Sequence, residues 1–251
     1  MRVALGQIFV DMDDRAGNLG RAEAAVAEGA GAGADLVGLP ECMDLGWLNE
    51  RDVGLAEPVP GPLTETYGSW AAAHGVYLVA GMTERAADGR VYNAAVMFDR
   101  KGALVHRHRK ISVLGIAAHI YTVGRSAGVV ETEFGRIGVH ICADAFPSAV
   151  TGVLGEMGAR LVVSPCSWAV DAGNEETNIA WLGDRYRDRT TETDIYLVGV
   201  DNIGEVKQGV WRGKIVQGDS LVFGPGGEKL LQGPRNEAAV LTVDLPIEPV
   251  D

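Results

Sequence analysis

The chain has 251 residues, of which 47% are hydrophobic, and this is enough to bury one sizeable core. We therefore expect one domain over residues 1–251. Asp and Glu number 34 against 22 Lys and Arg, so the net charge is −12. Such an acidic body repels phosphate backbones and anionic lipid surfaces, which argues against nucleic acids and membranes as partners.

The first apolar segment, residues 2–5, gives way to acidic residues from Asp11 onward and is too short for a signal peptide. No later segment has the length and apolar character of a membrane span. The three cysteines, Cys42, Cys142 and Cys166, are odd in number and widely spaced. This favours free thiols in a reducing cytoplasm, where each is either a small buried hydrophobe or a candidate for chemistry.

Apolar runs of strand length alternate with helical segments, which is typical of an α/β arrangement. In the first half, we expect strands over residues 3–9, 35–39, 76–80, 91–98 and 103–109, and helices over residues 21–30 and 64–74. Asn18 is the expected N-cap of the first helix, and Asp88-Gly89 is the expected turn of a hairpin.

The second half continues the alternation. We expect strands over residues 129–134, 137–141, 161–164, 195–200, 216–223 and 239–243, and helices over residues 147–157 and 174–191. Two irregular segments, residues 44–62 and 202–218, interrupt the pattern. Because long loops in compact domains are often functional, we expect them to form the walls of a pocket.

Three polar residues follow directly on strand-like runs: Glu41, Lys110 and Cys142. In sheets covered by helices, ligands bind in the crevice outside the strand ends, so we expect these side chains to converge on one site. A thiol becomes a strong nucleophile when a base removes its proton, and Glu41 can take that proton. Lys110 and the backbone amide of Ala143 can then stabilise the charge that develops during attack on an amide carbonyl or a nitrile.

The residues around these three positions resemble the signature stretches of the nitrilase superfamily of carbon–nitrogen hydrolases. The matching stretches, in the family's order, are Leu39-Pro40-Glu41, Arg109-Lys110-Ile111 and Ile141-Cys142-Ala143-Asp144-Ala145-Phe146-Pro147. The segment Ser164-Pro165-Cys166-Ser167-Trp168 also resembles a later family segment. Further similar pieces are residues 187–192, Asn202, residues 218–220 and residues 224–227.

This resemblance implies a four-layer α-β-β-α sandwich and homo-oligomers of at least two chains. It also implies a Glu41-Lys110-Cys142 triad that works through a covalent thioester, or a thioimidate, without metal or cofactor. By the same resemblance the Ala143 amide is the oxyanion donor, Trp168 lines the pocket and Asp144 holds the turn.

The sequence departs from the family pattern between the lysine and the cysteine. Many relatives carry a second glutamate there, whereas residues 114–124 contain no carboxylate. Ala117, Ala118 or His119 occupies the expected place. Three outcomes stay open: His119 substitutes for the glutamate, another acid reaches in, or hydrolysis is slower.

Three alternatives compete with the triad. His106 and His108 share one strand face and could bind a metal, although zinc sites need further ligands. His140 could pair with Cys142, but residues two apart on a strand point in parallel. The chain could also be a catalytically silent member that binds a small ligand or a partner protein.

The expected function is hydrolysis of a small amide or N-carbamoyl compound. A nitrile is the alternative substrate, and acyl transfer to an amine is the alternative reaction. A substrate carboxylate could pair with Arg107, Arg109 or Arg187.

Overall fold

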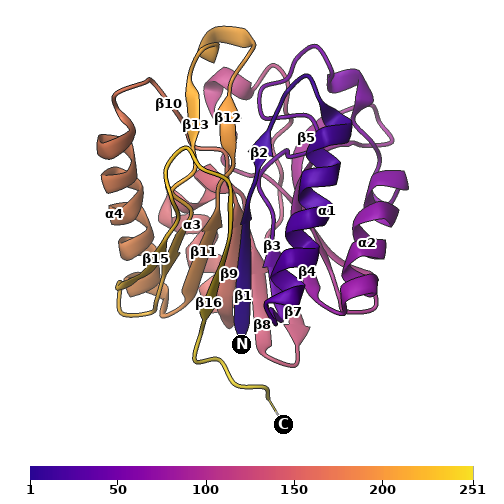
Figure 1. The fold of residues 1–251 in the computed structure, drawn as a ribbon. Coiled ribbons are helices and arrows are strands. Elements are labelled where there is room, and N and C mark those ends of the chain that lie inside the picture. The colour runs from indigo at the N-terminus through magenta and orange to yellow at the C-terminus, as the bar shows by residue number, and fades with distance from the viewer. Residues whose placement is uncertain (251) are drawn as a thin grey trace.

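Two six-stranded sheets pack face to face, and each carries a pair of helices on its outer face (Figure 1). The computed structural model describes residues 1–250. Helices α1 and α2 lie on one sheet, and helices α3 and α4 lie on the other. The fold is therefore the expected four-layer α-β-β-α sandwich. None of its helices within residues 1–250 has an apolar run long enough to cross a bilayer.

The first sheet has the order β16-β1-β3-β4-β5-β6. Its strands are β1 (Arg2–Gln7), β3 (Leu36–Gly38), β4 (Tyr77–Arg85), β5 (Val91–Phe98), β6 (Leu104–Arg109) and β16 (Ala239–Asp244). It is covered by α1 (Arg15–Gly31) and α2 (Pro62–His74). Strands β1, β3 and β4 are parallel, and β5 and β6 continue as antiparallel neighbours, so β6 again runs in the direction of β4.

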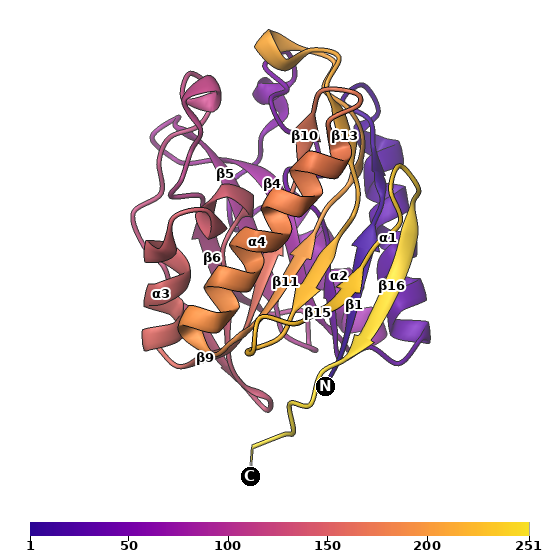
Figure 2. The ribbon, with the colours of Figure 1, turned by 90° about the vertical axis from the view of Figure 1, so that its left-hand side faces the viewer.

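The second sheet has the order β15-β14-β11-β9-β8-β7. Its strands are β7 (Val129–Thr132), β8 (Gly135–Val139), β9 (Ala159–Pro165), β11 (Tyr196–Val200), β14 (Leu221–Phe223) and β15 (Lys229–Gln232), and its helices are α3 (Ser148–Glu156) and α4 (Glu175–Thr193). Figure 2 shows α3 and α4 in front of this sheet. The parallel strands β8, β9 and β11 end at one edge.

A small third sheet lies beyond one end of the sandwich, at the upper end in Figure 1. Its order is β10-β13-β12-β2, from β10 (Ala169–Val170), β13 (Ile215–Gln217), β12 (Ile203–Glu205) and β2 (Phe9–Val10). Four short 3₁₀ helices complete the described elements: η1 (Val53–Leu55), η2 (Gly115–Ala117), η3 (Cys142–Ala145) and η4 (Gly209–Trp211).

The core consists of apolar side chains between the two sheets and beneath each helix pair. The sheets approach closely around Gly38, where an added Cβ would lie 2.8 Å from Val200 and 3.4 Å from Val163. A larger residue at this position would push the sheets apart. The close packing fixes the strand ends of both sheets relative to one another, and those ends carry the candidate site.

Several element boundaries differ from the prediction. Helix α1 begins at Arg15 because Asp14, and not Asn18, caps it: the Asp14 carboxylate accepts a hydrogen bond from the Gly17 amide at 2.9 Å. Asn18 lies inside the helix and accepts a hydrogen bond from the Asp11 amide at 2.8 Å.

Two of the expected strands are divided between sheets. The expected strand over residues 3–9 splits into β1 and β2, and the one over residues 216–223 splits into β13 and β14. The second break falls at Gly218 and Asp219, whose φ angles of 75° and 57° redirect the chain. Strand β4 is longer than expected because it pairs with β5 as far as Arg85 opposite Val91.

Candidate active site

A buried ion pair joins the ends of β3 and β6. Lys110 Nζ donates a hydrogen bond to Glu41 Oε1 at 2.6 Å, and both residues are at most 2% exposed. Asn93 Nδ2 donates to the same oxygen at 2.5 Å. Glu41 Oε2 is buried and has no hydrogen-bond partner in the described structure. One carboxylate oxygen is thus held by two donors, and the other is free to accept a proton.

The backbone around Glu41 packs so closely against β4 that there is no room for a side chain at Gly81. A Cβ at Gly81 of β4 would lie 2.3 Å from the Pro40 oxygen and 2.6 Å from Glu41 Cα, so this position requires glycine. Although burial alone lowers the pKa of Lys110, the neighbouring Glu41 charge outweighs it and raises that pKa above its ordinary value. Lys110 is therefore an ammonium ion at neutral pH.

Cys142 follows β8 and opens the short helix η3. Its φ is 46°, a left-handed conformation that costs a non-glycine residue about 1–3 kcal/mol. Its amide donates to Ser164 Oγ at 3.0 Å, which holds the residue in this conformation. The Ala143 amide precedes the first hydrogen bond of η3, which runs from the Asp144 amide to the Ile141 oxygen. The Ala143 N–H therefore takes no part in the hydrogen bonds of the helix.

The electrostatic environment keeps the Cys142 thiol protonated. Hydrogen bonding with Cys166, burial and the Glu41 charge raise the pKa of this thiol well above its ordinary value, and Lys110 opposes them only in part. Proton transfer to a base must therefore accompany any nucleophilic attack by this sulfur.

Asp144 connects the segment after Lys110 to the turn that carries Cys142. Its fully buried carboxylate meets His108 Nε2 at 2.8 Å, and it accepts backbone hydrogen bonds from Ser112 at 2.6 Å and from Ile111 and Ile141 at 3.1 Å each. Burial alone would raise the pKa of Asp144, but His108 and the backbone donors lower it to about 2. Asp144 thus holds the turn and ties one sheet to the other.

Cys142 lines a cavity of about 200 Å³. Aromatic side chains dominate its wall: Trp47, Phe146, Trp168, Trp181 and Trp211. Trp47 belongs to the segment 44–62 and Trp211 to the segment 202–218, so both expected loops contribute to the wall. The two rings meet edge to face, with centroids 5.3 Å apart.

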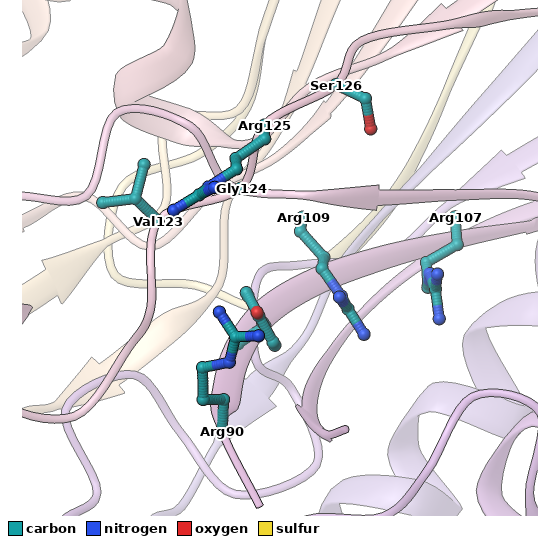
Figure 3. Close-up of a pocket in the computed structure, with 8 residues that line it drawn as sticks. Arg90, Arg107, Arg109, Val123, Gly124, Arg125 and Ser126 are labelled. Carbon is teal, nitrogen blue, oxygen red and sulfur yellow. The ribbon is translucent and has the colours of Figure 1, made fainter. Parts of the chain in front are cut away.

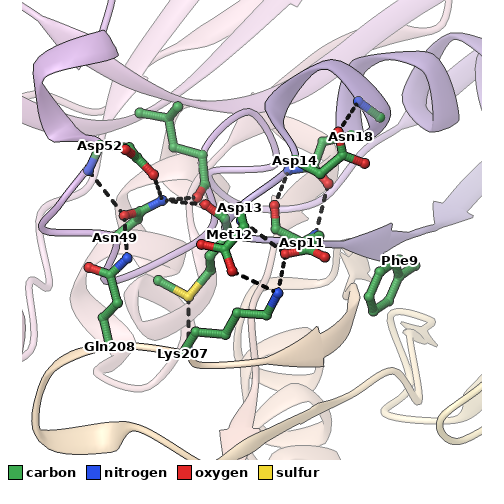
Figure 4. Close-up of polar contacts among 12 residues, drawn as sticks. Phe9, Asp11, Met12, Asp13, Asp14, Asn18, Asn49, Asp52, Lys207 and Gln208 are labelled. Carbon is green, nitrogen blue, oxygen red and sulfur yellow. Dashed lines mark hydrogen bonds and ion pairs between the residues drawn. The ribbon is translucent and has the colours of Figure 1, made fainter.

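The two wall loops are fastened to the N-terminal segment (Figure 4). Lys207 Nζ pairs with the carboxylates of Asp11 and Asp13. Gln208 Nε2 donates to Asn49 Oδ1 at 2.9 Å, which joins one loop to the other. The position of the wall tryptophans therefore depends on polar contacts between three chain segments.

The structure brings Glu41 and Lys110 into contact and places Cys142 and Trp168 in the wall of the cavity. His119 lies elsewhere. Its side chain is 55% exposed and its Nε2 pairs with Glu50 Oε1 at 2.7 Å. It neither lines the cavity nor contacts Lys110, so it does not take the place of a second glutamate.

Asn93 is the functional candidate that the sequence analysis missed. Its side-chain amide is buried inside the otherwise apolar strand β5, and its backbone carbonyl oxygen accepts a hydrogen bond from the Lys110 backbone amide at 2.9 Å. A polar residue within a buried apolar strand was the available signal. Phe146, Trp181 and the two loop tryptophans were also missed as wall residues, because no spacing distinguishes them from core aromatics.

The histidine alternatives find no support in the contacts. His108 is engaged by Asp144, and burial lowers the pKa of His106 to about 4. In residues 1–250 no group of three or more His, Cys, Asp or Glu side chains is arranged to hold a metal ion. Both ring nitrogens of His140 are without partners, and burial lowers the pKa of this histidine to about 4, so it is not hydrogen-bonded to Cys142.

The arginines expected to meet a substrate carboxylate lie outside the cavity. Arg107 and Arg109 line a separate surface pocket together with Arg90 and Arg125 (Figure 3). Both pair with the buried Glu84, at 3.0 and 2.5 Å. Arg187 pairs with Asp184 on an exposed face of α4. The expectation that one of them binds substrate in this site was wrong, because alternate residues of β6 point to opposite faces of its sheet.

A four-layer α/β sandwich, with a thiol in the wall of a cavity and a buried carboxylate–ammonium pair beyond the ends of two strands of one sheet, defines a candidate thiol hydrolase. The comparison with known families agrees. The family model described as carbon–nitrogen hydrolase matches residues 2–251, so the chain belongs to this family, within the nitrilase superfamily, and is a carbon–nitrogen hydrolase.

Relatives and solved structures agree with this membership. Omega-amidase NIT2 of Danio rerio is 27% identical over 248 residues, which cover 95% of this chain and 86% of the relative. The human omega-amidase NIT2 is 25% identical, over 97% of this chain and 88% of its own. An amidase from Nesterenkonia sp. superposes with a TM-score of 0.86 at 22% identity, over 99% of this chain and 91% of its own.

Proposed function

We propose that the protein hydrolyses small amides, with Cys142 as nucleophile, Glu41 as general base and acid, and Lys110 with the Ala143 amide as oxyanion stabilisers. The observation that carries this proposal is the buried Lys110–Glu41 pair, in which Oε2 of the carboxylate is left without a partner. A base with a free oxygen is what a protonated thiol requires.

The proposed reaction proceeds in two halves. Glu41 Oε2 takes the thiol proton as Sγ of Cys142 bonds to the amide carbon, and the negative oxygen is stabilised by Lys110 and the Ala143 amide. The C–N bond then breaks, and Glu41 returns the proton to the leaving ammonia. In the second half, water gives a proton to Glu41 as its oxygen bonds to the thioester carbon. The C–S bond then breaks, Glu41 returns this proton to Sγ of Cys142, and the carboxylic acid is released.

Amides are the preferred substrates because relatives point to them. The omega-amidases are named for this activity, and a variant of the Nesterenkonia amidase was solved with acrylamide added to its active-site cysteine. The same site could take N-carbamoyl compounds or nitriles. Amine acyl transfer is the further alternative, since the cavity wall is apolar and Cys142 is only 6% exposed.

The test is ammonia release from a panel of small amides, N-carbamoyl compounds and nitriles, with Cys142→Ala and Glu41→Gln as variants. Both variants should lose at least about 10³-fold in kcat. Cys166→Ser is the thiol comparison: it removes the neighbour that helps to raise the pKa of Cys142 but leaves the nucleophile in place, so turnover should persist. A Cys142→Ala variant that keeps the wild-type rate would contradict the proposal.

The reactivity of the Cys142 thiol also distinguishes an active enzyme from a catalytically silent member that only binds a ligand or a partner. An activated Cys142 should form an adduct with electrophilic amides, seen as a mass increase that the Cys142→Ala variant lacks. Absence of both turnover and adduct across the panel would favour a ligand- or partner-binding role.

We also propose a cytoplasmic location, a single domain over residues 1–251 and assembly into homo-oligomers. Three buried free thiols support the reducing compartment. Strand β16, late in the sequence, pairs antiparallel with β1, the first strand, in one sheet. This pairing supports one folding unit. Exposed apolar side chains on the side of α3 and α4, namely Val153, Met157 and Trp181, support the oligomer.

A further inference from the structure

The wall of the cavity carries aromatic rings and no charge. Four of the five tryptophans of the chain line it, with Phe146 beside them. Its polar members, Ser167 and Asn178, are neutral. Within residues 1–250 no arginine, lysine, aspartate or glutamate belongs to this wall.

Cations do lie near the rings of three of the tryptophans, but each is already paired. Lys214 Nζ lies 5.0 Å from the Trp211 ring and 2.7 Å from Asp171 Oδ2. Arg185 lies 5.8 Å from the Trp181 ring and pairs with Asp188 at 3.2 Å. Lys110 Nζ lies 5.9 Å from the Trp47 ring and is bound to Glu41. Each of these three cations is therefore already paired with a carboxylate.

A carboxylate that enters such a cavity loses its hydration without gaining a partner, which is unfavourable. The net charge of −12 adds repulsion before entry. An uncharged ring or branched hydrocarbon instead gains contact with the aromatic wall.

Resting on the proposed function, we infer that the substrate is an uncharged amide whose acyl group is a single aromatic ring or a compact branched hydrocarbon, and not the monoamide of a dicarboxylic acid. The volume of the cavity also fits an acyl group of this kind. An apolar cavity of about 150 Å³ suffices for benzene in a protein core, and this one measures about 200 Å³. The walls thus select acyl groups by charge and by bulk.

The experiment compares kcat/KM for phenylacetamide and isobutyramide with kcat/KM for the monoamides of succinic and glutaric acid, by ammonia release from the full-length protein. The uncharged amides should be preferred by at least about 100-fold. Equal or better turnover of the acidic monoamides would overturn the inference and leave the proposed function intact. Turnover of none of the four, without any Cys142 adduct, would overturn both.

A wall variant tests whether charge is the cause. Leu114 lines the cavity and is partly exposed, so Leu114→Arg places a cation there, whereas Leu114→Gln changes polarity without charge. Leu114→Arg should raise kcat/KM for glutaric monoamide about 10-fold or more and lower it for phenylacetamide. A similar gain with Leu114→Gln, or none with Leu114→Arg, would count against recognition by charge.

Binding can be followed separately from chemistry. Because four tryptophans line the cavity, their fluorescence should change as the Cys142→Ala variant is titrated with phenylacetamide. The same titration with glutaric monoamide should give at least about 100-fold weaker binding. Tighter binding of the acidic amide would overturn the inference whatever the catalytic rates are.

Discussion

Asp144 is the residue on which the relative placement of Lys110 and Cys142 depends. Its carboxylate accepts hydrogen bonds from the backbone that follows Lys110 and from the backbone that precedes Cys142. The two segments come from different sheets. A single buried anion therefore sets the distance between the ammonium and the thiol, and Asp144 is a positioning residue that need not touch substrate.

We predict that Asp144→Asn lowers kcat at least about 100-fold and destabilises the fold by about 2–3 kcal/mol, the free energy that corresponds to a pKa lowered to about 2. Because this pKa is lowered in the folded state, the stabilisation is fully present above about pH 4 and is lost as the pH falls toward 2. Urea unfolding between pH 2 and 7 measures it.

In the wild type, stability should fall across the acid window, and the difference from Asp144→Asn should shrink there. The surface variant Asp88→Asn is the control, since Asp88 pairs only with exposed Arg90 on a distant turn. A difference between wild type and Asp144→Asn that stays constant from pH 7 to 2 would show that the Asp144 charge does not stabilise the fold.

At the scale of elements, residue patterns predicted most helices and strands, but not how the strands are shared between sheets. The run 3–9 is apolar apart from Gln7, and one polar residue does not reveal that Gln7 ends one strand and that Phe9 begins another in a different sheet. Strand β15 escaped prediction because its four residues, Lys229 to Gln232, are mostly exposed. Such pairings are decided by tertiary contacts.

The candidate site, too, could be predicted only in part from the sequence. Glu41, Lys110 and Cys142 were identifiable because each follows a strand within a recognisable stretch. The surroundings were not, since His119 and Glu50 are neighbours only through loop conformation, and Asn93 meets Glu41 across 52 residues of sequence. Local sequence indicates which groups are chemically able to react, whereas packing decides which groups orient them.

The loop contacts of Lys207 give a prediction at the same scale. Lys207→Met removes the pairing with Asp11 and Asp13, so the loop that carries Trp211 should become more mobile. We expect KM for an apolar amide to rise about 3- to 10-fold with little change in kcat, because the triad lies on strand ends that this loop does not hold. Stability should change by at most about 1 kcal/mol, as for other surface ion pairs.

Steady-state kinetics check this, with Arg136→Met as the matched control. Arg136 also forms a surface ion pair, with Glu131 at 2.6 Å, but on the β7–β8 hairpin and not in a wall loop. Its loss should leave both kinetic constants unchanged. Equal effects of the two variants would show that the Lys207 contacts do not control the cavity.

At the scale of the whole molecule, the two helix layers differ in what they leave exposed. On the side of α3 and α4, Val153 is 49%, Met157 36% and Trp181 44% exposed, and α3 packs beside α4. Apolar groups clustered on an outer helical face are typical of contacts between copies of a chain. The ring of Trp181 also packs against Phe146 on the cavity wall, so a partner that covers this face would restrain the wall as well.

We therefore predict that the protein is at least a dimer in solution and that Val153→Glu with Met157→Glu converts it to a monomer, because two carboxylates on each copy would be buried without partners. Light scattering coupled to size-exclusion chromatography measures the mass.

The control is Leu55→Glu with Val123→Glu, which charges two exposed apolar residues outside α3 and α4 and should leave the assembly intact. The monomer should also bind amides more weakly, since Trp181 loses its cover. A wild-type mass of one chain at every concentration would contradict an interface on this face, and so would a double variant that keeps the wild-type mass.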